Sequence, residues 1–168
     1  MSYAEDTKVS VEKSRAELDT MLQRAGAHQR IMGNDDVNGT AFVGFAIGTG
    51  ADMRQVRLTV PLPKFDTYAL RPARAGARDQ RPTRLTAEQQ TTAYEQATRS
   101  RWRAVVLLVK AKLEAVELGV STIEREFLAD IYLPSGETVA QHLGPKLAAA
   151  YLSGSMPPML GMGSAQGA

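Results

Sequence analysis

The strongest pattern in the chain runs from Trp102 to Val120, where apolar residues recur every three or four positions. At about 3.6 residues per turn, such spacing puts them on one side of an α-helix. That side holds Trp102, Val105, Val106, Val109, Leu113, Val116 and Val120. Thr86, with Gln89 three residues later, predicts the N-terminal cap, and Gly119 predicts the stop. We therefore expect one continuous helix over residues 86–118 with its valine-rich side buried.

A second side of this helix carries small residues. Ala104, Ala111 and Ala115 share it, with Leu108 beside them. A small-residue surface lets another helix approach closely, either within one subunit or between subunits. We expect the protein to form a homo-oligomer.

Three segments before this helix have the two-residue alternation of β-strands. They read HQRIMG (28–33), TAFVGFAIG (40–48) and RQVRLTVPLP (54–63). The clusters NDDVNG and GTGAD separate them as turns. Alternation puts Val43 and Phe45 on the same side of the second strand, and Val56 and Leu58 on the same side of the third. The pattern predicts an antiparallel meander of two to three strands with one apolar face.

Shorter helices are expected on both sides of this core. The first covers residues 10–25, capped by Ser14 with Glu17 and stopped by Gly26. The second runs from Ser121 to about Ala129, and the last covers residues 138–152 with a break at Gly144 and Pro145. The fold class is therefore α+β: an N-terminal helix, the meander, a long central helix and shorter C-terminal helices. Residues 1–152 are expected to form a single domain, followed by a flexible tail over 153–168 rich in Gly, Pro, Ser and Met.

Composition limits the classes of protein. The chain of 168 residues is 43% hydrophobic and has no cysteine, which excludes disulfides, thiolate metal sites and cysteine nucleophiles. It has no apolar run long enough to cross a bilayer, and the acidic start MSYAEDTKVSVEKS is unlike a secretory signal. We expect a protein of the cytoplasm without membrane contact.

Charge is unevenly distributed although the net charge is only +2. Residues 64–112 contain 11 basic and four acidic residues, whereas the rest of the chain contains nine basic and 14 acidic residues. Residues 64–85 have no periodicity, and we interpret them as an exposed basic loop. Arginine forks match phosphate geometry, so we expect nucleic acid, DNA rather than RNA, as the partner. The candidate nucleic-acid-binding residues are Arg57, Arg71, Arg74, Arg78, Arg81, Arg84, Arg99, Arg101 and Arg103.

No constellation of catalytic or metal-binding residues is recognisable. NDDVNG follows the start of a calcium loop, but Phe45 stands where the loop requires a bidentate glutamate. The GTG at residues 48–50 lacks the further residues of a phosphate-binding loop. His28 and His142 are single, and the glutamates of the long helix have no His or Cys beside them. We expect a non-catalytic protein without a cofactor or a metal.

Several stretches carry a resemblance. RWRAVVLLVKAKLEAVELGVSTIEREFLADIYLPSGETV, followed by MPPML, resembles small proteins of unassigned activity that tailed phages and prophages encode. VSVEKSRAELDTMLQRAGA and VRLTVPLPKFD fit the same family. The resemblance implies a phage origin and a bacterial host cytoplasm, and it transfers no catalytic residue. A meander followed by a long helix is also similar to the core of Rad52-like single-strand annealing proteins, by analogy of fold alone.

The sequence thus predicts a nucleic-acid-binding protein of phage DNA metabolism, in single-strand binding or annealing, that uses its arginine-rich loop. Two alternatives remain open. The first is a protein–protein interaction module, such as a phage antagonist of a host protein. The second is a minor virion or assembly component. Trp102 has two interpretations as well, core packing or stacking on a base.

Overall fold

The computed structural model describes residue 4 and residues 6–71 and 81–155, and it confirms the α+β class. Helix α1 (Val11–Arg24) precedes strands β1 (His28–Asp35), β2 (Thr40–Ile47) and β3 (Arg54–Pro61). The long helix α2 (Ala87–Glu117) follows, and then α3 (Ile123–Phe127) and α4 (Val139–Ser153). Shorter elements complete the chain: the 3-10 helices η1 (Gly50–Asp52), η2 (Phe65–Ala69) and η3 (Leu128–Asp130), and strands β4 (Leu70–Arg71) and β5 (Thr83–Arg84).

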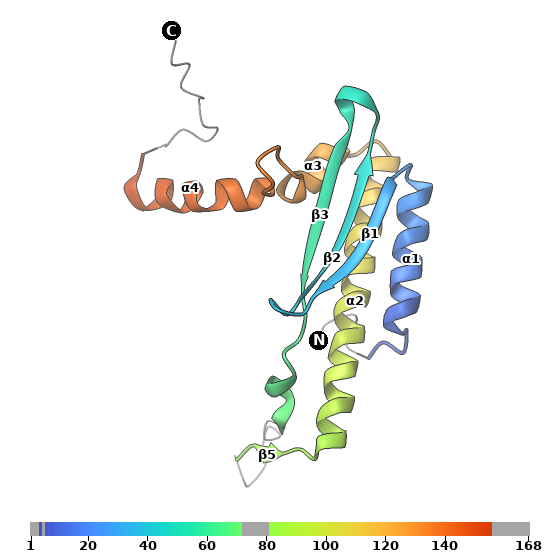
Figure 1. Ribbon diagram of the computed structural model, residues 1–168, viewed down its shortest axis with the longest axis vertical. Coiled ribbons are helices and arrows are strands. Elements are labelled where there is room, and N and C mark those ends of the chain that lie inside the picture. Colours follow the sequence, from blue (N-terminus) through green and yellow to red (C-terminus); the bar gives the residue numbers. More distant parts are fainter. Residues whose placement is uncertain (1–3, 5, 72–80, 156–168) are drawn as a thin grey trace.

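The three long strands form an antiparallel meander in the order β1-β2-β3. Helices α1 and α2 lie side by side across one face of this sheet (Figure 1). The core lies between them, and its largest buried side chains are Leu18, Leu22, Val43, Phe45, Trp102, Val106, Val109 and Phe127. The opposite face, called the outer face below, has no described helix over it (Figure 1).

Capping explains why α2 begins and ends where the sequence predicts. The Thr86 hydroxyl accepts a hydrogen bond from the Gln89 backbone N–H, and the Gln89 side chain accepts one from the Thr86 backbone N–H. After the helix, Gly119 adopts φ +69°, a left-handed conformation that glycine reaches without strain. Gly26 ends α1 in the same way at φ +81°. The continuous central helix is therefore confirmed.

Four local predictions are wrong. Ser10, not Ser14, caps α1, and Ser14 is buried with its hydroxyl unpartnered. Thr122, one residue after the predicted Ser121, caps α3. Val120 lies beyond the end of α2 and is 74% exposed, so it does not belong to the buried stripe.

The predicted break in the last helix is also absent, since α4 continues through Pro145. Proline lacks an N–H and leaves one carbonyl of the preceding turn without its partner. That carbonyl belongs to Gln141, an exposed residue, so water can satisfy it. In the part of the chain that is described, no helix combines the length and the apolarity that crossing a bilayer requires.

Candidate nucleic-acid interface

The segment predicted as a basic loop is partly structured and folds back onto α2. Within it, η2 places Phe65 and Tyr68 against Tyr94 of the helix, with ring centroids 5.5 Å and 6.4 Å apart, respectively, in edge-to-face geometry. The Gln90 side chain also donates a hydrogen bond to the Phe65 carbonyl at 3.1 Å. Such aromatic pairs add to the burial of apolar area. Residues 65–71 and 83–84 therefore do not form the predicted loop. The sequence pattern did not indicate this because the contacts with α2 join residues that are far apart along the chain.

A short antiparallel ribbon continues from η2. Leu70 of β4 pairs with Arg84 of β5, and Arg71 pairs with Thr83. The Leu85 N–H donates to the Ala69 carbonyl at 3.0 Å and extends this pairing toward α2. Because the chain returns beside its own start, both arms of the arginine-rich segment lie at the lower end of α2 (Figure 1). The exposure predicted for this segment is confirmed at Arg71, Arg81 and Arg84.

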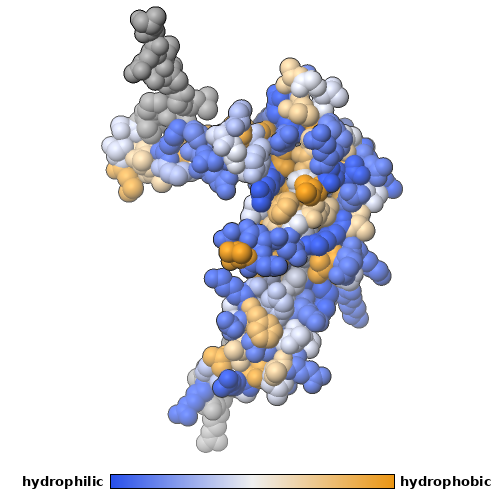
Figure 2. All heavy atoms as spheres, viewed as in Figure 1, coloured by the Kyte–Doolittle hydropathy of each residue, from blue (hydrophilic) through white to orange (hydrophobic). Residues whose placement is uncertain are grey.

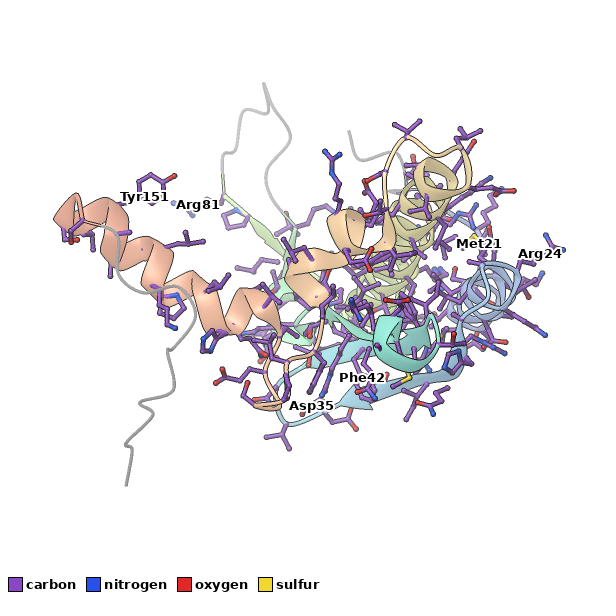
Figure 3. All side chains as sticks on the ribbon, turned by 90° about the horizontal axis from the view of Figure 1, so that it is seen from above. Met21, Arg24, Asp35, Phe42, Arg81 and Tyr151 are labelled. Atoms are coloured by element: carbon purple, nitrogen blue, oxygen red, sulfur yellow. The ribbon has the colours of Figure 1, made fainter. Side chains whose placement is uncertain are left out.

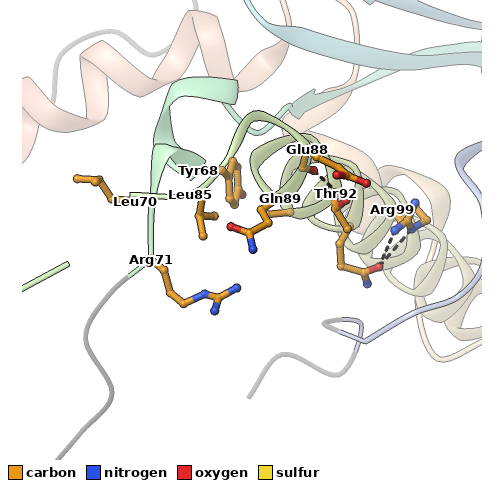
Figure 4. A pocket seen from close by; sticks show the side chains of 10 residues that line it. Tyr68, Leu70, Arg71, Leu85, Glu88, Gln89, Thr92 and Arg99 are labelled. Carbon is orange, nitrogen blue, oxygen red and sulfur yellow. Dashed lines mark hydrogen bonds between the residues drawn. The ribbon is translucent and has the colours of Figure 1, made fainter. Parts of the chain in front are cut away.

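A groove of about 540 Å³ lies between this ribbon and the first half of α2 (Figure 4). We call it the foot groove. On the helix side its residues recur every three or four positions and so share one face. Its lining comprises Tyr68, Leu70, Arg71, Leu85, Glu88, Gln89, Thr92, Ala93, Gln96 and Arg99. The groove thus combines apolar side chains, side-chain amides and two arginines with one acid.

The two arginines of the foot groove are held differently. Arg99 donates from Nε and Nη2 to Oε1 of Gln96, at 3.2 Å and 2.9 Å, and its Nη1 lies 3.7 Å from Oε2 of Glu95 (Figure 4 shows the bonds to Gln96). These contacts fix the guanidinium along the helix. Arg71 is exposed on β4 and extends beneath Gln89 in the same view (Figure 4). One guanidinium is therefore oriented and the other is open to solvent.

Among the described residues, the other candidates do not form one surface. Arg74 and Arg78 lie outside the described residues. Arg101 is exposed on the side of α2 away from Arg99, since two residues along a helix turn the side chain by about 200°. Arg103 forms an ion pair with Glu17 of α1 at 2.5 Å. Arg57 lies on the outer face of the sheet.

Sequence reasoning did not find Gln89, Thr92 and Gln96 as groove residues. Their spacing from Arg99, at intervals of three and four, was the available signal. It points to one helix face but not to what covers that face. Only the pairing of β4 with β5 brings Arg71 to the same place.

Comparisons of the chain with protein-family models, with curated proteins and with solved structures find no match. Among the described residues, no group of three or more His, Cys, Asp or Glu side chains is placed to hold a metal ion.

Proposed function

We propose that this protein binds single-stranded nucleic acid, DNA rather than RNA, at the foot groove and the arginine-rich segment that borders it, without catalysis. The observation that carries the proposal is the juxtaposition of Arg71 and Arg99 on opposite walls of one groove. Guanidinium groups suit phosphate oxygens, and two of them along a groove can follow a phosphate backbone.

The apolar part of the groove favours a single strand over a duplex. Tyr68, Leu70 and Leu85 line it on the side of the ribbon. Bases of a single strand have free faces that need apolar or aromatic cover, whereas duplex bases are already stacked. The amides of Gln89 and Gln96 add donors and acceptors without a fixed base preference.

The charge of the bordering segment favours binding that is independent of base sequence. Residues 70–85 contain five arginines, at 71, 74, 78, 81 and 84, and a single acid, Asp79. Phosphate contacts of this kind provide affinity but carry no sequence information. The resemblance to small phage proteins implies a phage origin, and with this origin we propose a place in phage DNA metabolism.

Charge reversal at the foot groove tests the proposal. We expect Arg71→Glu to weaken binding of a fluorescent oligonucleotide of about 15 nucleotides by at least tenfold, by removing an attraction and adding a repulsion. Arg101→Glu is the matched control, because this arginine is also exposed but lies on another side of α2. Fluorescence anisotropy with single-stranded DNA, single-stranded RNA and duplex DNA measures both preferences, for DNA over RNA and for a single strand over a duplex.

Equal losses from the two substitutions would mean that only net charge matters and would reject the foot groove as the site. Tighter binding of duplex than of single strand would reject the preference for a single strand.

A second candidate function, protein association, is favoured by α4. Its 15 residues include one lysine, one histidine and no acid, yet none of its side chains is buried. Tyr151 and Leu152 are each 90% exposed, and α4 projects from the body of the molecule (Figures 1 and 3). A helix with so few polar residues is normally covered by protein. We propose a second copy of this chain as the cover, because the side of α2 with Ala104, Leu108 and Ala111 is also exposed.

Light scattering on the purified protein tests this association. We expect a dimer or larger assembly at micromolar concentration, and a monomer after Tyr151→Asp with Leu152→Asp. A wild-type monomer at that concentration would reject self-association. The exposed side chains of α4 would then be a surface for binding a host protein.

A further inference from the structure

The outer face of the sheet has a hollow whose lining includes Gly44 and Ala46 of β2. A Cβ on Gly44 would lie 2.9 Å from Cγ2 of Ile31, and a Cβ on Gly33 would lie 2.6 Å from the ring of Phe42. Each glycine is therefore crossed by a side chain from the neighbouring strand. Gly44 and the small Ala46 line the hollow, together with the side chains of Ile31 and Phe42.

One wall of this hollow is an arginine stacked on an aromatic ring. The Arg57 guanidinium carbon lies 4.4 Å from the Phe42 ring centroid. Its Nη1 also donates a hydrogen bond of 3.0 Å to the Tyr132 hydroxyl, and the Tyr132 backbone N–H donates to the Gln55 carbonyl at the edge of β3. The guanidinium is thus positioned by the Phe42 ring beneath it and by the Tyr132 hydroxyl at its end.

The opposite wall contains the one non-glycine residue with positive φ in the described chain. Gln29 has φ 52°, within an irregularity of β1 between His28 and Ile31. A non-glycine residue in this conformation costs roughly 1–3 kcal/mol, and such residues cluster at functional sites. β-Bulges also redirect side chains, and here the bulge brings Gln29 to the rim of the hollow.

The hollow encloses about 250 Å³, below the roughly 300–1,000 Å³ of sites for drug-sized ligands. It therefore fits one small ring system. Figure 2 shows this side of the molecule, where hydrophobic residues are exposed over the sheet with hydrophilic residues around them. Phe42 and Asp35 mark the outer face in Figure 3, on the side of the sheet away from α2.

Charge on this face is balanced, which argues against a phosphate as the main ligand group. Asp35 shares the face with Arg57, and hydrogen bonds from Asn38, with a smaller contribution from the Arg57 charge, lower the pKa of the Asp35 carboxyl. A carboxylate and a guanidinium together leave no net positive charge. What the hollow offers is a flat cationic plane, an apolar floor and two amides, those of Gln29 and Gln55.

We propose that this hollow binds one unpaired nucleobase, stacked on the Arg57 guanidinium that Phe42 supports. Bases stack on guanidinium planes and aromatic rings, and glutamine amides bind base edges. The inference rests on the proposed function when the base belongs to a bound strand, and it stands independently when the base belongs to a free nucleotide.

The experiment compares a thymine oligonucleotide of about 15 nucleotides with an abasic oligonucleotide of equal length, by fluorescence anisotropy. A titration with thymidine monophosphate forms a third arm. We expect the wild-type protein to prefer the oligonucleotide with bases by roughly 5- to 100-fold, the contribution of a stacked base. Phe42→Leu and Arg57→Lys should each reduce that preference at least fivefold.

Arg57→Lys keeps the charge and removes only the plane, so an effect of this variant identifies stacking. Tyr151→Ala is the matched control, since it removes an exposed aromatic ring from α4. Both pocket residues are partly exposed, and thermal unfolding of each variant verifies the fold.

The other outcomes separate the base site from the proposed function. A preference unchanged by both variants overturns the base site and leaves the proposed function intact. Equal wild-type affinity for both oligonucleotides overturns the base site and also the argument that the foot groove covers bases. Binding of the mononucleotide alone, lost in Phe42→Leu, supports the base site and overturns single-strand binding. Absence of binding in all three arms overturns both.

Discussion

Nη1 of Arg103 lies 2.5 Å from Oε2 of Glu17, and this ion pair joins α2 to α1 across the side of the core. The side chains are 26% and 39% exposed. Arg103, which the sequence predicted as a phosphate ligand, therefore contacts a carboxylate of its own chain.

We predict that Arg103→Ala lowers the free energy of unfolding by about 0.5–1 kcal/mol, as expected for a partly exposed ion pair. A double-mutant cycle with Glu17→Gln, measured by urea denaturation, should recover most of this loss as a coupling energy. Oligonucleotide affinity should change less than twofold. A tenfold loss of oligonucleotide affinity with an unchanged free energy of unfolding would show that Arg103 contacts nucleic acid.

Trp102 belongs to the core. It is 1% exposed, and the Arg15 guanidinium lies 4.4 Å from its ring centroid. Because Trp102 is the only tryptophan of the chain, tryptophan fluorescence reports on the environment of this one side chain. We predict short-wavelength emission, little quenching by acrylamide and no change on saturation with oligonucleotide. Strong quenching by the oligonucleotide would instead favour base stacking on Trp102.

Asp130 makes stability depend on pH. Burial raises the pKa of its carboxyl above the ordinary value, and the charge of Lys112 opposes this shift only in part. Between the ordinary and the raised pKa, the folded state binds more protons than the unfolded state. This contribution to stability is complete at acid pH and is lost as the pH rises through the raised pKa.

Asp130→Asn should therefore be more stable than the wild type at pH 7, because an amide avoids the burial of a charge. The difference in the free energy of unfolding between Asp130→Asn and the wild type should decrease as the pH is lowered toward the ordinary pKa of 3.8. Urea denaturation at several pH values measures it. A variant less stable than the wild type at pH 7 would show that the contact with Lys112 outweighs burial.

The elements that the sequence predicted correctly have local causes. The capping box of Thr86 and Gln89 and the stop at Gly119 lie within a few residues of the helix ends that they define. The meander is likewise determined by alternation within each strand and by turns between neighbours.

The parts that the sequence missed depend on distant contacts. Nothing near Phe65 indicates that its ring meets Tyr94 of α2, and this contact turns an apparent loop into one wall of a groove. The stack of Arg57 on Phe42 is similar, since strand pairing alone brings the two side chains together. Arginine count identified a basic segment, but the fold decided which arginines share a surface.

The salt dependence of single-strand binding is the most direct test of the account. Each phosphate contact should lower the affinity about 2.5-fold between about 50 and about 200 mM salt. With Arg71 and Arg99 both engaged, we predict a loss of at least about sixfold for the wild type, and a shallower slope for Arg71→Ala. Affinity that does not change with salt, or no binding at about 50 mM salt, would contradict nucleic-acid binding at the foot groove.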